Sequence, residues 1–255
     1  MKRTLLTILL AGILAASCQH GKPASTAQSE ATQDNPTTET DEMAEAAETP
    51  AEAPVEVSMT GSINPDTWTP EEKATVTLSH IPTTVDGFRQ LQSQIGGTPQ
   101  GAVALQLVAF EMYNQQTEVG TECVKLNNTE TNVPSVMRRL PDIFGKNSLD
   151  DSYPRRHLVA TFFDGATPEN GFNPTRPYTI TVRSSKVHDY QRAESLKGYV
   201  LYLEVYSTGY DTHWRGCEVV KQKGHEYYTV SNSPSMYVQC KEVPFDASED
   251  YKGLQ

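Results

Sequence analysis

The sequence predicts an α+β domain, in which about four helices come first and a small, curved, mainly antiparallel sheet or partly open barrel follows. Between residues 84 and 145, apolar residues recur at helical spacing between capping residues and glycines. From about residue 155 to residue 243 the period changes to two, and aromatic and β-branched residues become frequent. Helices followed by strands, rather than alternating with them, are typical of the α+β class.

The N-terminus has the pattern of a signal peptide. A basic pair at residues 2–3 precedes an apolar run, residues 4–14, that is shorter than the ~20 residues of a membrane-spanning helix. The small residues at 15–17 directly before Cys18 resemble the lipobox of bacterial lipoproteins. The resemblance implies cleavage before Cys18 and a diacylglycerol thioether on its sulfur, so that the protein is anchored to the inner or outer membrane of the cell envelope. An ordinary secretory signal is the alternative.

A long acidic segment follows Cys18. Residues 19–57 contain nine Asp and Glu residues and one Lys, a net charge of −8, and almost no large apolar side chains. Such a segment cannot bury enough apolar surface to offset its chain entropy, and its like charges extend it. We therefore expect residues 18–60 to form a lipidated, disordered tether and residues 61–255 to form a single domain.

The expected domain is mildly acidic. The whole chain of 255 residues carries a net charge of −11, and subtracting the tether and the basic pair of the signal peptide leaves −5 for residues 61–255. The sequence shows no basic patch that would bind phosphate backbones, which argues against nucleic acid as a partner.

Local signals place the elements of the first half. Residues 61–82 give weak signals, for a short helix that begins at Thr69 and a short strand at 76–78. Thr84 and Thr98 are then expected to be N-caps of two helices. The second of these helices is apolar nearly all round, which is typical of a buried central helix. Two further helices are expected at residues 118–126 and from residue 132 or 133 to Pro141.

The second half is predicted to form strands. Residues 199–206 are aromatic and β-branched on both faces, so this strand is expected at the centre of the sheet. Lys221-Gln222-Lys223-Gly224 has the composition of a hairpin turn. The expected strands are residues 157–163, 178–182, 199–206, 217–220, 227–231 and 236–240.

A long loop, residues 164–178, is expected to be ordered and to bind a partner. Thr167 followed by Pro168 is typical of a capped helical turn, and Gly171 tolerates the positive φ that ends such a turn. Loops longer than ~12 residues are usually functional or disordered, and three prolines argue against disorder. Phe172 is expected to point inward, and Glu169 is expected to be exposed.

Several segments of the domain resemble an uncharacterised bacterial domain family with an ATPENG-type loop. The resemblance covers roughly residues 84–243, and it implies no activity, ligand or mechanism. This chain has Tyr210-Asp211-Thr212-His213-Trp214 where that family tends to have a Gly-Ala-Asp-Ser-Pro-like turn. The segments that carry the resemblance are Tyr153-Pro154-Arg155, Gly165-Ala166-Thr167-Pro168-Glu169-Asn170-Gly171-Phe172, Pro177-Tyr178-Thr179 and Thr98-Pro99-Gln100-Gly101-Ala102.

The cysteines and histidines do not form a known motif. Cys123, Cys217 and Cys240 remain after lipidation of Cys18, and buried thiols are preferred to a bridge between Cys217 and Cys240. The histidines lack the HExxH or CxxC context of metal sites, so neither a metal nor a cofactor is expected. The catalytic alternative needs His157 or His213 to converge with Asp164 or Glu169.

The leading hypothesis is a non-enzymatic, lipid-anchored binding or accessory module of the cell envelope. Aromatic residues are concentrated in the second half, where many belong to the core and a few are available to stack on a glycan or contact an envelope protein. The alternative hypotheses are an envelope hydrolase or isomerase in a cone-shaped fold and a purely structural spacer. The candidate binding residues are Glu169, Asn170, Arg176 and Trp214.

The lipoprotein hypothesis predicts the behaviour of one variant. Cys18→Ala removes the sulfur that would carry the lipid, and two or three acyl chains at roughly 0.8 kcal/mol per buried methylene are what would hold the protein on a membrane. We expect the variant to leave the membrane fraction after cell fractionation, whereas a Cys123→Ala control stays with it. A Cys18→Ala protein that still partitions with the membranes would contradict lipidation.

Overall fold

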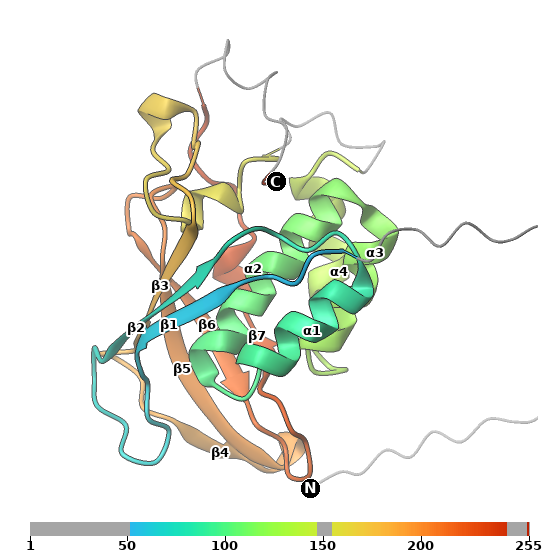
Figure 1. Ribbon diagram of the computed structural model, residues 1–255. Helices are drawn as coiled ribbons and strands as arrows, with labels where there is room; N and C mark the ends of the chain where they lie inside the picture. Colours follow the sequence, from blue (N-terminus) through green and yellow to red (C-terminus); the bar gives the residue numbers. More distant parts are fainter. Residues whose placement is uncertain (1–51, 147–154, 244–253, 255) are drawn as a thin grey trace, which may run out of the picture. The chain divides into compact units, whose positions relative to one another are not determined.

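The computed structural model describes residues 52–146, 155–243 and 254. The chain divides into two units, Met1–Glu48 and Thr49–Gln255. All the described residues belong to the second unit. Here four helices lie on one face of an open seven-stranded antiparallel sheet (Figure 1), which confirms the predicted α+β class. Cys18 and the residues that were expected to form the signal peptide lie outside the described residues.

The helices begin where the capping residues predict. The side chain of Thr84 accepts a hydrogen bond from the Gly87 N–H, and that of Thr98 accepts one from the Gly101 N–H. Pro141, which was expected to bend or end the last helix, lies inside its final turn. The helices are α1 (Val85–Ile95), α2 (Pro99–Gln115), α3 (Thr117–Asn127) and α4 (Val133–Ile143).

The sheet has the order β1-β2-β3-β5-β6-β7, and the short β4 pairs with one end of β5. All of the pairs between these strands are antiparallel. Two of the strands precede the helices. The strand Lys73–Leu78 confirms the short strand expected at residues 76–78, whereas the strand Val57–Gly61 was not predicted. The strands are β1 (Val57–Gly61), β2 (Lys73–Leu78), β3 (Tyr178–Ser184), β4 (Gln191–Ala193), β5 (Gly198–Tyr206), β6 (Trp214–Val220) and β7 (Thr229–Asn232).

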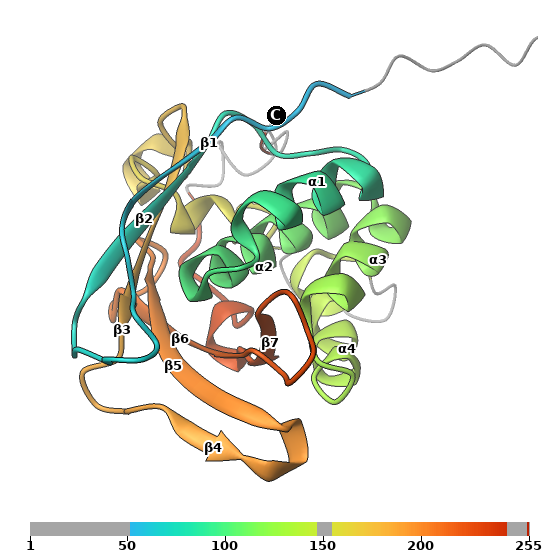
Figure 2. The same ribbon diagram turned by 60° about the horizontal axis from the view of Figure 1, so that its bottom comes forward.

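Helix α2 occupies the centre of the fold, as its composition predicts. Every residue from Pro99 to Asn114 is buried. The helix contacts β2, β3, β5, β6 and β7 on one side and α1 and α3 on the other (Figures 1 and 2). The side chains of β5 that face it, Leu201, Leu203 and Val205, are also buried. The end of the sheet formed by β4 and the start of β5 extends past the helices (Figure 2).

Two of the predicted strands are wrong. Residues 157–163 form a turn and a short 3₁₀ helix, η1 (Ala160–Phe162), and every side chain in this segment is buried. A short apolar run that is buried on all sides has no periodicity to distinguish a strand from a helical turn. The other is the predicted strand at residues 236–240: Met236 ends another 3₁₀ turn, η4 (Pro234–Met236), and residues 237–240 form a loop after it. A loop contact holds them instead of a strand ladder, because the Tyr210 hydroxyl donates to the Val238 carbonyl.

The boundary between tether and domain also lies earlier than predicted. Val55 is buried, and β1 begins at Val57, inside the segment that was assigned to the tether. The Glu52 carboxylate accepts hydrogen bonds from both the backbone N–H and the hydroxyl of Thr83 and Thr84, next to the start of α1. Burial raises the pKa of Glu52, but these hydrogen bonds outweigh it and the net shift is downward. The acidic composition of residues 52–60 therefore conceals a structural role.

Two truncations test this boundary. We expect deletion of residues 19–48 to leave the thermal midpoint of unfolding nearly unchanged. Deletion of residues 19–61 removes β1, Val55 and Glu52, and burial of one aliphatic side chain alone contributes about 1.5–3 kcal/mol. We expect this second deletion to lower the midpoint by several degrees in calorimetry, since 1 kcal/mol corresponds to about 2–4 °C in a domain of this size. Equal midpoints for the two truncated proteins would show that residues 52–61 do not stabilise the fold.

Candidate functional site

The 164–178 loop is ordered by its own side chains. Thr167 caps the 3₁₀ turn η2 (Pro168–Asn170) in a capping box with Asn170, and Gly171 follows with a φ of 66°. Phe172 also has a positive φ, 57°, and its side chain is completely buried. The predicted cap, turn and inward anchor are confirmed.

The predicted binding residues of this loop have different environments. The Asn170 side chain donates to the Gly165 and Asn173 carbonyls and accepts from the Thr167 and Asn173 N–H groups. These four bonds use the hydrogen-bonding capacity of its amide, so Asn170 builds the loop and is not free to contact a ligand. Glu169 and Arg176 are exposed. The Arg176 guanidinium lies 5.4 Å from the centre of the Tyr178 ring.

Trp214, the remaining predicted binding residue, is half-buried at the start of β6. The Arg183 guanidinium lies over its ring at 4.0 Å, and the Tyr206 ring packs against it edge to face at 5.4 Å. Because Arg183 covers one face of the ring, that face of Trp214 packs within the protein and is not available to stack on a ligand.

His157, the first histidine of the catalytic alternative, is part of the packing. The His157 ring is buried and stacks on Phe172 at 5.0 Å, and its Nε2 lies 2.9 Å from the Lys241 carbonyl and 3.4 Å from the Cys240 sulfur. An Nε2 that donates to a carbonyl cannot accept the thiol proton, and burial raises the pKa of Cys240 to about 12. Burial also lowers the pKa of His157. This pair therefore stays neutral and does not have the ionisation of a catalytic thiolate.

The other predicted groups agree with a structural role. His213 Nδ1 lies 3.0 Å from the Ser207 carbonyl, and its ring stacks on Tyr206. Cys123, Cys217 and Cys240 are buried free thiols, as preferred from the sequence. Within residues 52–146, 155–243 and 254, no cluster of three or more His, Cys, Asp or Glu residues has a geometry suited to a metal ion.

A pocket of about 530 Å³ lies at the end of the sheet that extends past the helices. Ligand pockets in proteins typically have volumes of about 300–1,000 Å³. We call it the cationic pocket after its four basic side chains. These are Arg192 on β4, Lys197 between β4 and β5, Lys221 after β6 and Lys223 in the following turn. Asp66 is the acidic residue of the lining, so basic groups dominate in a domain whose net charge is negative.

Tyrosines form the other part of the lining. Tyr190 packs edge to face on Tyr199 at 5.5 Å and on Trp68 at 6.1 Å. Tyr228 is largely buried, and burial first, then the charge of Asp66, raises the pKa of its hydroxyl. The Lys221 ammonium lies 5.6 Å from the centre of the Tyr228 ring. The pocket therefore combines positive charge with aromatic surface.

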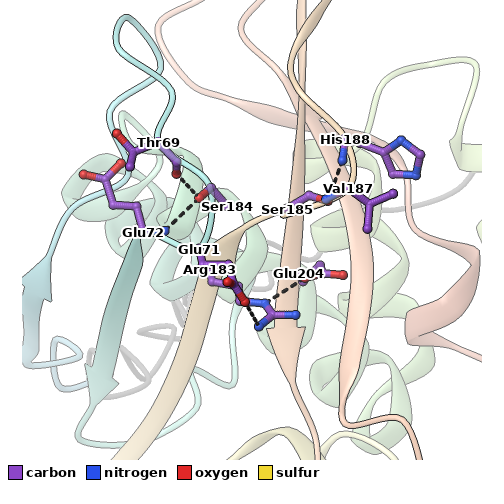
Figure 3. A network of polar contacts seen from close by, with 9 residues as sticks. All are labelled: Thr69, Glu71, Glu72, Arg183, Ser184, Ser185, Val187, His188 and Glu204. Carbon is purple, nitrogen blue, oxygen red and sulfur yellow. Dashed lines mark hydrogen bonds and ion pairs between the residues drawn. The ribbon is translucent and has the colours of Figure 1, made fainter.

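The end of β3 positions two loops that form walls of the cationic pocket. Figure 3 shows Ser184 between Thr69 and Glu72: its hydroxyl donates to the Thr69 carbonyl and accepts from the Glu72 N–H at 2.9 Å. These bonds fix the segment after Asp66, where turns replace the helix predicted at Thr69 and Trp68 has a φ of 23°. The neighbouring Ser185 hydroxyl accepts from the N–H groups at 187 and 188, at 3.2 and 3.0 Å, in the loop that leads to Tyr190.

Arg183 reinforces the same junction. Its guanidinium pairs with Glu71 at 2.9 Å and with Glu204 at 2.7 Å (Figure 3), and its side chain is 9% exposed. Glu71 is 51% exposed and Glu204 is 21% exposed, so Glu204 is the partner whose loss would leave the buried guanidinium with less compensation. The network therefore stabilises the geometry of the loops without contributing a residue to the lining of the pocket.

Sequence reasoning missed this pocket because it has no local motif. Its lining comes from the 65–66 loop, β4 and the residues on either side of it, the start of β5, the turn after β6 and the segment before β7. The concentration of basic residues between positions 186 and 223 was the available signal. It was hidden by the negative charge of the domain as a whole.

Comparisons with known proteins identify one family. The family model described as a domain of unknown function (DUF6935) matches residues 80–244, which include every lining segment of the cationic pocket except residues 65–66. No curated protein and no solved structure matches the chain. Among the helices of the described part, none has both the length and the apolar character needed to cross a membrane.

The role of Ser184 is testable with a conservative variant. Ser184→Ala removes two buried hydrogen bonds, each with a net contribution of about 0.5–1.5 kcal/mol. We expect a thermal midpoint several degrees lower and faster amide hydrogen exchange across residues 65–72. Ser58→Ala, at an exposed position of β1, is the control and should match the wild type. Unchanged exchange in the Ser184→Ala protein would show that other contacts hold the loop.

Proposed function

The chain belongs to the DUF6935 family, whose function is unknown, and we propose that it is a non-enzymatic binding module of a lipid-anchored envelope protein that holds an anionic ligand in the cationic pocket. The observation that supports this most directly is the set of four basic side chains around one pocket in an acidic domain. The lipid anchor rests on the sequence before Cys18, and the ligand-binding role rests on the pocket.

The charges of the pocket are available to a ligand. Arg192 pairs with Glu194 at 2.7 Å, but both side chains are mostly exposed, and such pairs contribute little. Among the described residues, no carboxylate lies within ion-pair distance of the Lys197, Lys221 or Lys223 ammonium. Neighbouring like charges repel one another, and an anion between them removes that repulsion.

The negative charge of the domain does not cancel this local potential. At physiological ionic strength the Debye length is about 8 Å, so an exposed charge acts mainly on its immediate surroundings. An anionic ligand at the pocket therefore interacts with the four basic groups and Asp66 more than with distant carboxylates. The proposed binding surface is therefore the cationic pocket, which is lined mainly by residues between 190 and 228. It replaces Glu169 and Arg176 of the 164–178 loop, where a partner was expected from the sequence.

The enzyme alternative has weaker support. It requires an imidazole and a carboxylate that exchange protons at an accessible site. His157 instead lies buried between Phe172 and Cys240, with its Nε2 at hydrogen-bond distance from the Lys241 carbonyl. His213 is exposed, but its Nδ1 is at hydrogen-bond distance from the Ser207 carbonyl.

Calorimetric titration of the full-length chain in detergent tests the proposal. The probes are dextran sulfate and neutral dextran of the same length. We expect saturable binding of dextran sulfate alone. Lys221→Gln/Lys223→Gln should weaken binding about five- to tenfold, since each exposed charge interaction contributes roughly 0.2–1 kcal/mol.

The matched control removes the same charge elsewhere. Lys125→Gln/Lys241→Gln neutralises two lysines that pair with Glu122 and Asp211 and do not line the pocket. It should bind dextran sulfate as the wild type does. Equal weakening in both double variants, or binding of neutral dextran, would contradict ligand binding at the cationic pocket.

A further inference from the structure

Tyr199 is the starting point for the chemistry of the ligand. Its side chain is 52% exposed, although it lines the cationic pocket and precedes the buried Leu201 and Leu203 on the same face of β5. Tyr190 supports it from one edge at 5.5 Å with an interplanar angle of 80°. A large ring held by a neighbour and left half-exposed in a pocket is a platform on which a ligand ring can stack.

Basic residues flank this platform on both neighbouring strands. Arg192 on β4 is the direct register partner of Tyr199. On the other side, Val200 pairs with Val220 of β6, which places Lys221 beside Tyr199 in the next strand. Neighbouring strands are about 4.8 Å apart, so the row from Arg192 through Tyr199 to Lys221 spans roughly 10 Å. The positive charges thus lie on both sides of a stacking surface, separated from each other, and not at a single point.

The other lining groups suit hydroxyls better than a dense anion. The Asp66 carboxylate, which repels a polyphosphate, accepts hydrogen bonds from hydroxyl groups. It lies close enough to Tyr228 to raise the pKa of that hydroxyl after burial has done so. A ligand that carries both hydroxyls and separated negative charges satisfies Asp66 and the basic side chains together.

The pocket also lacks the usual features of a phosphate site. The backbone N–H groups of Lys223 and Tyr228 donate to the Lys197 and Gly96 carbonyls and are not directed to a ligand. No α-helix N-terminus is among the lining segments described. Arg192 can pair bidentately with a carboxylate, and the three lysines add separate point charges for further carboxylates.

We propose that the ligand of the cationic pocket is a carboxylated sugar chain, with one ring stacked on Tyr199 and carboxylates on either side near Arg192 and Lys221. This rests on the proposed function, because it names the class of anionic ligand for the same pocket. A pocket volume of about 530 Å³ accommodates a short segment of such a chain rather than a single ion.

Calorimetry with the full-length chain tests the class of ligand. The probes are trigalacturonate, a mannuronate trimer and a hyaluronan tetrasaccharide, each compared with its methyl-esterified form, together with inorganic triphosphate. We expect at least one carboxylated probe to bind at least tenfold more tightly than its ester and than triphosphate. Tyr199→Ala should weaken that binding at least tenfold, whereas Tyr199→Phe, which keeps the ring, should stay within about threefold of the wild type.

The outcomes separate the two proposals. If dextran sulfate binds through Lys221 and Lys223 but no carboxylated probe exceeds its ester, or triphosphate binds more tightly, the sugar inference is overturned and the proposed function stands. Equal binding by the Tyr199→Ala and Tyr199→Phe proteins, both with wild-type thermal midpoints, also overturns it. If no anionic probe binds in a lysine-dependent manner, both proposals are wrong.

Discussion

The structure depends on the burial of α2. The helix is apolar nearly all round and cannot present a polar face to water, so it requires cover on every side. The sheet curves along one side of it, and α1 and α3 cover the other (Figure 2). Strand β5 is longer than the part that α2 covers, and Tyr199 near its start is therefore exposed while Leu201 and Leu203 are buried. The cationic pocket occupies this uncovered end.

Polar contacts then connect the helical half to the walls of the pocket. The buried Gln106 side chain on α2 bonds with Asn127 and Asn128 at the end of α3, and the Thr129 N–H donates to the Val230 carbonyl of β7. Buried amides of this kind are costly unless satisfied, so they favour one arrangement of the elements. The Tyr228 N–H donates to the Gly96 carbonyl after α1. The segment that carries Lys221 and Lys223 is thereby fixed to the helices at its far end.

The sequence predicts the elements whose signals are local. Thr84 and Thr98 identify helix starts through hydrogen bonds within a few residues, and the order of Thr167, Pro168 and Gly171 predicts the turn of the 164–178 loop. The strand predicted at residues 157–163 is wrong because a segment buried on all sides has no periodicity that distinguishes a strand from a helical turn. Strand β1 was not predicted, because the segment before it is acidic and was assigned to the tether. Its pairing with β2, which is distant in sequence, stabilises it. The pocket requires the pairing of β4, β5 and β6, which no local pattern reveals.

The pocket and the core make separate demands on the sequence. Arg192, Lys197, Lys221 and Lys223 are exposed, and none belongs to the hydrophobic core. The residues that hold the adjoining loops, Arg183 and Ser184, are buried at the end of β3 and do not line the pocket. Substitution of the basic residues therefore changes the charge offered to a ligand with little effect on the free energy of unfolding, since exposed positions without buried partners usually contribute within ±0.5 kcal/mol. Under the proposed function, the exposed basic residues and Tyr199 determine which ligand binds, while α2 and the end of β3 keep the shape of the pocket.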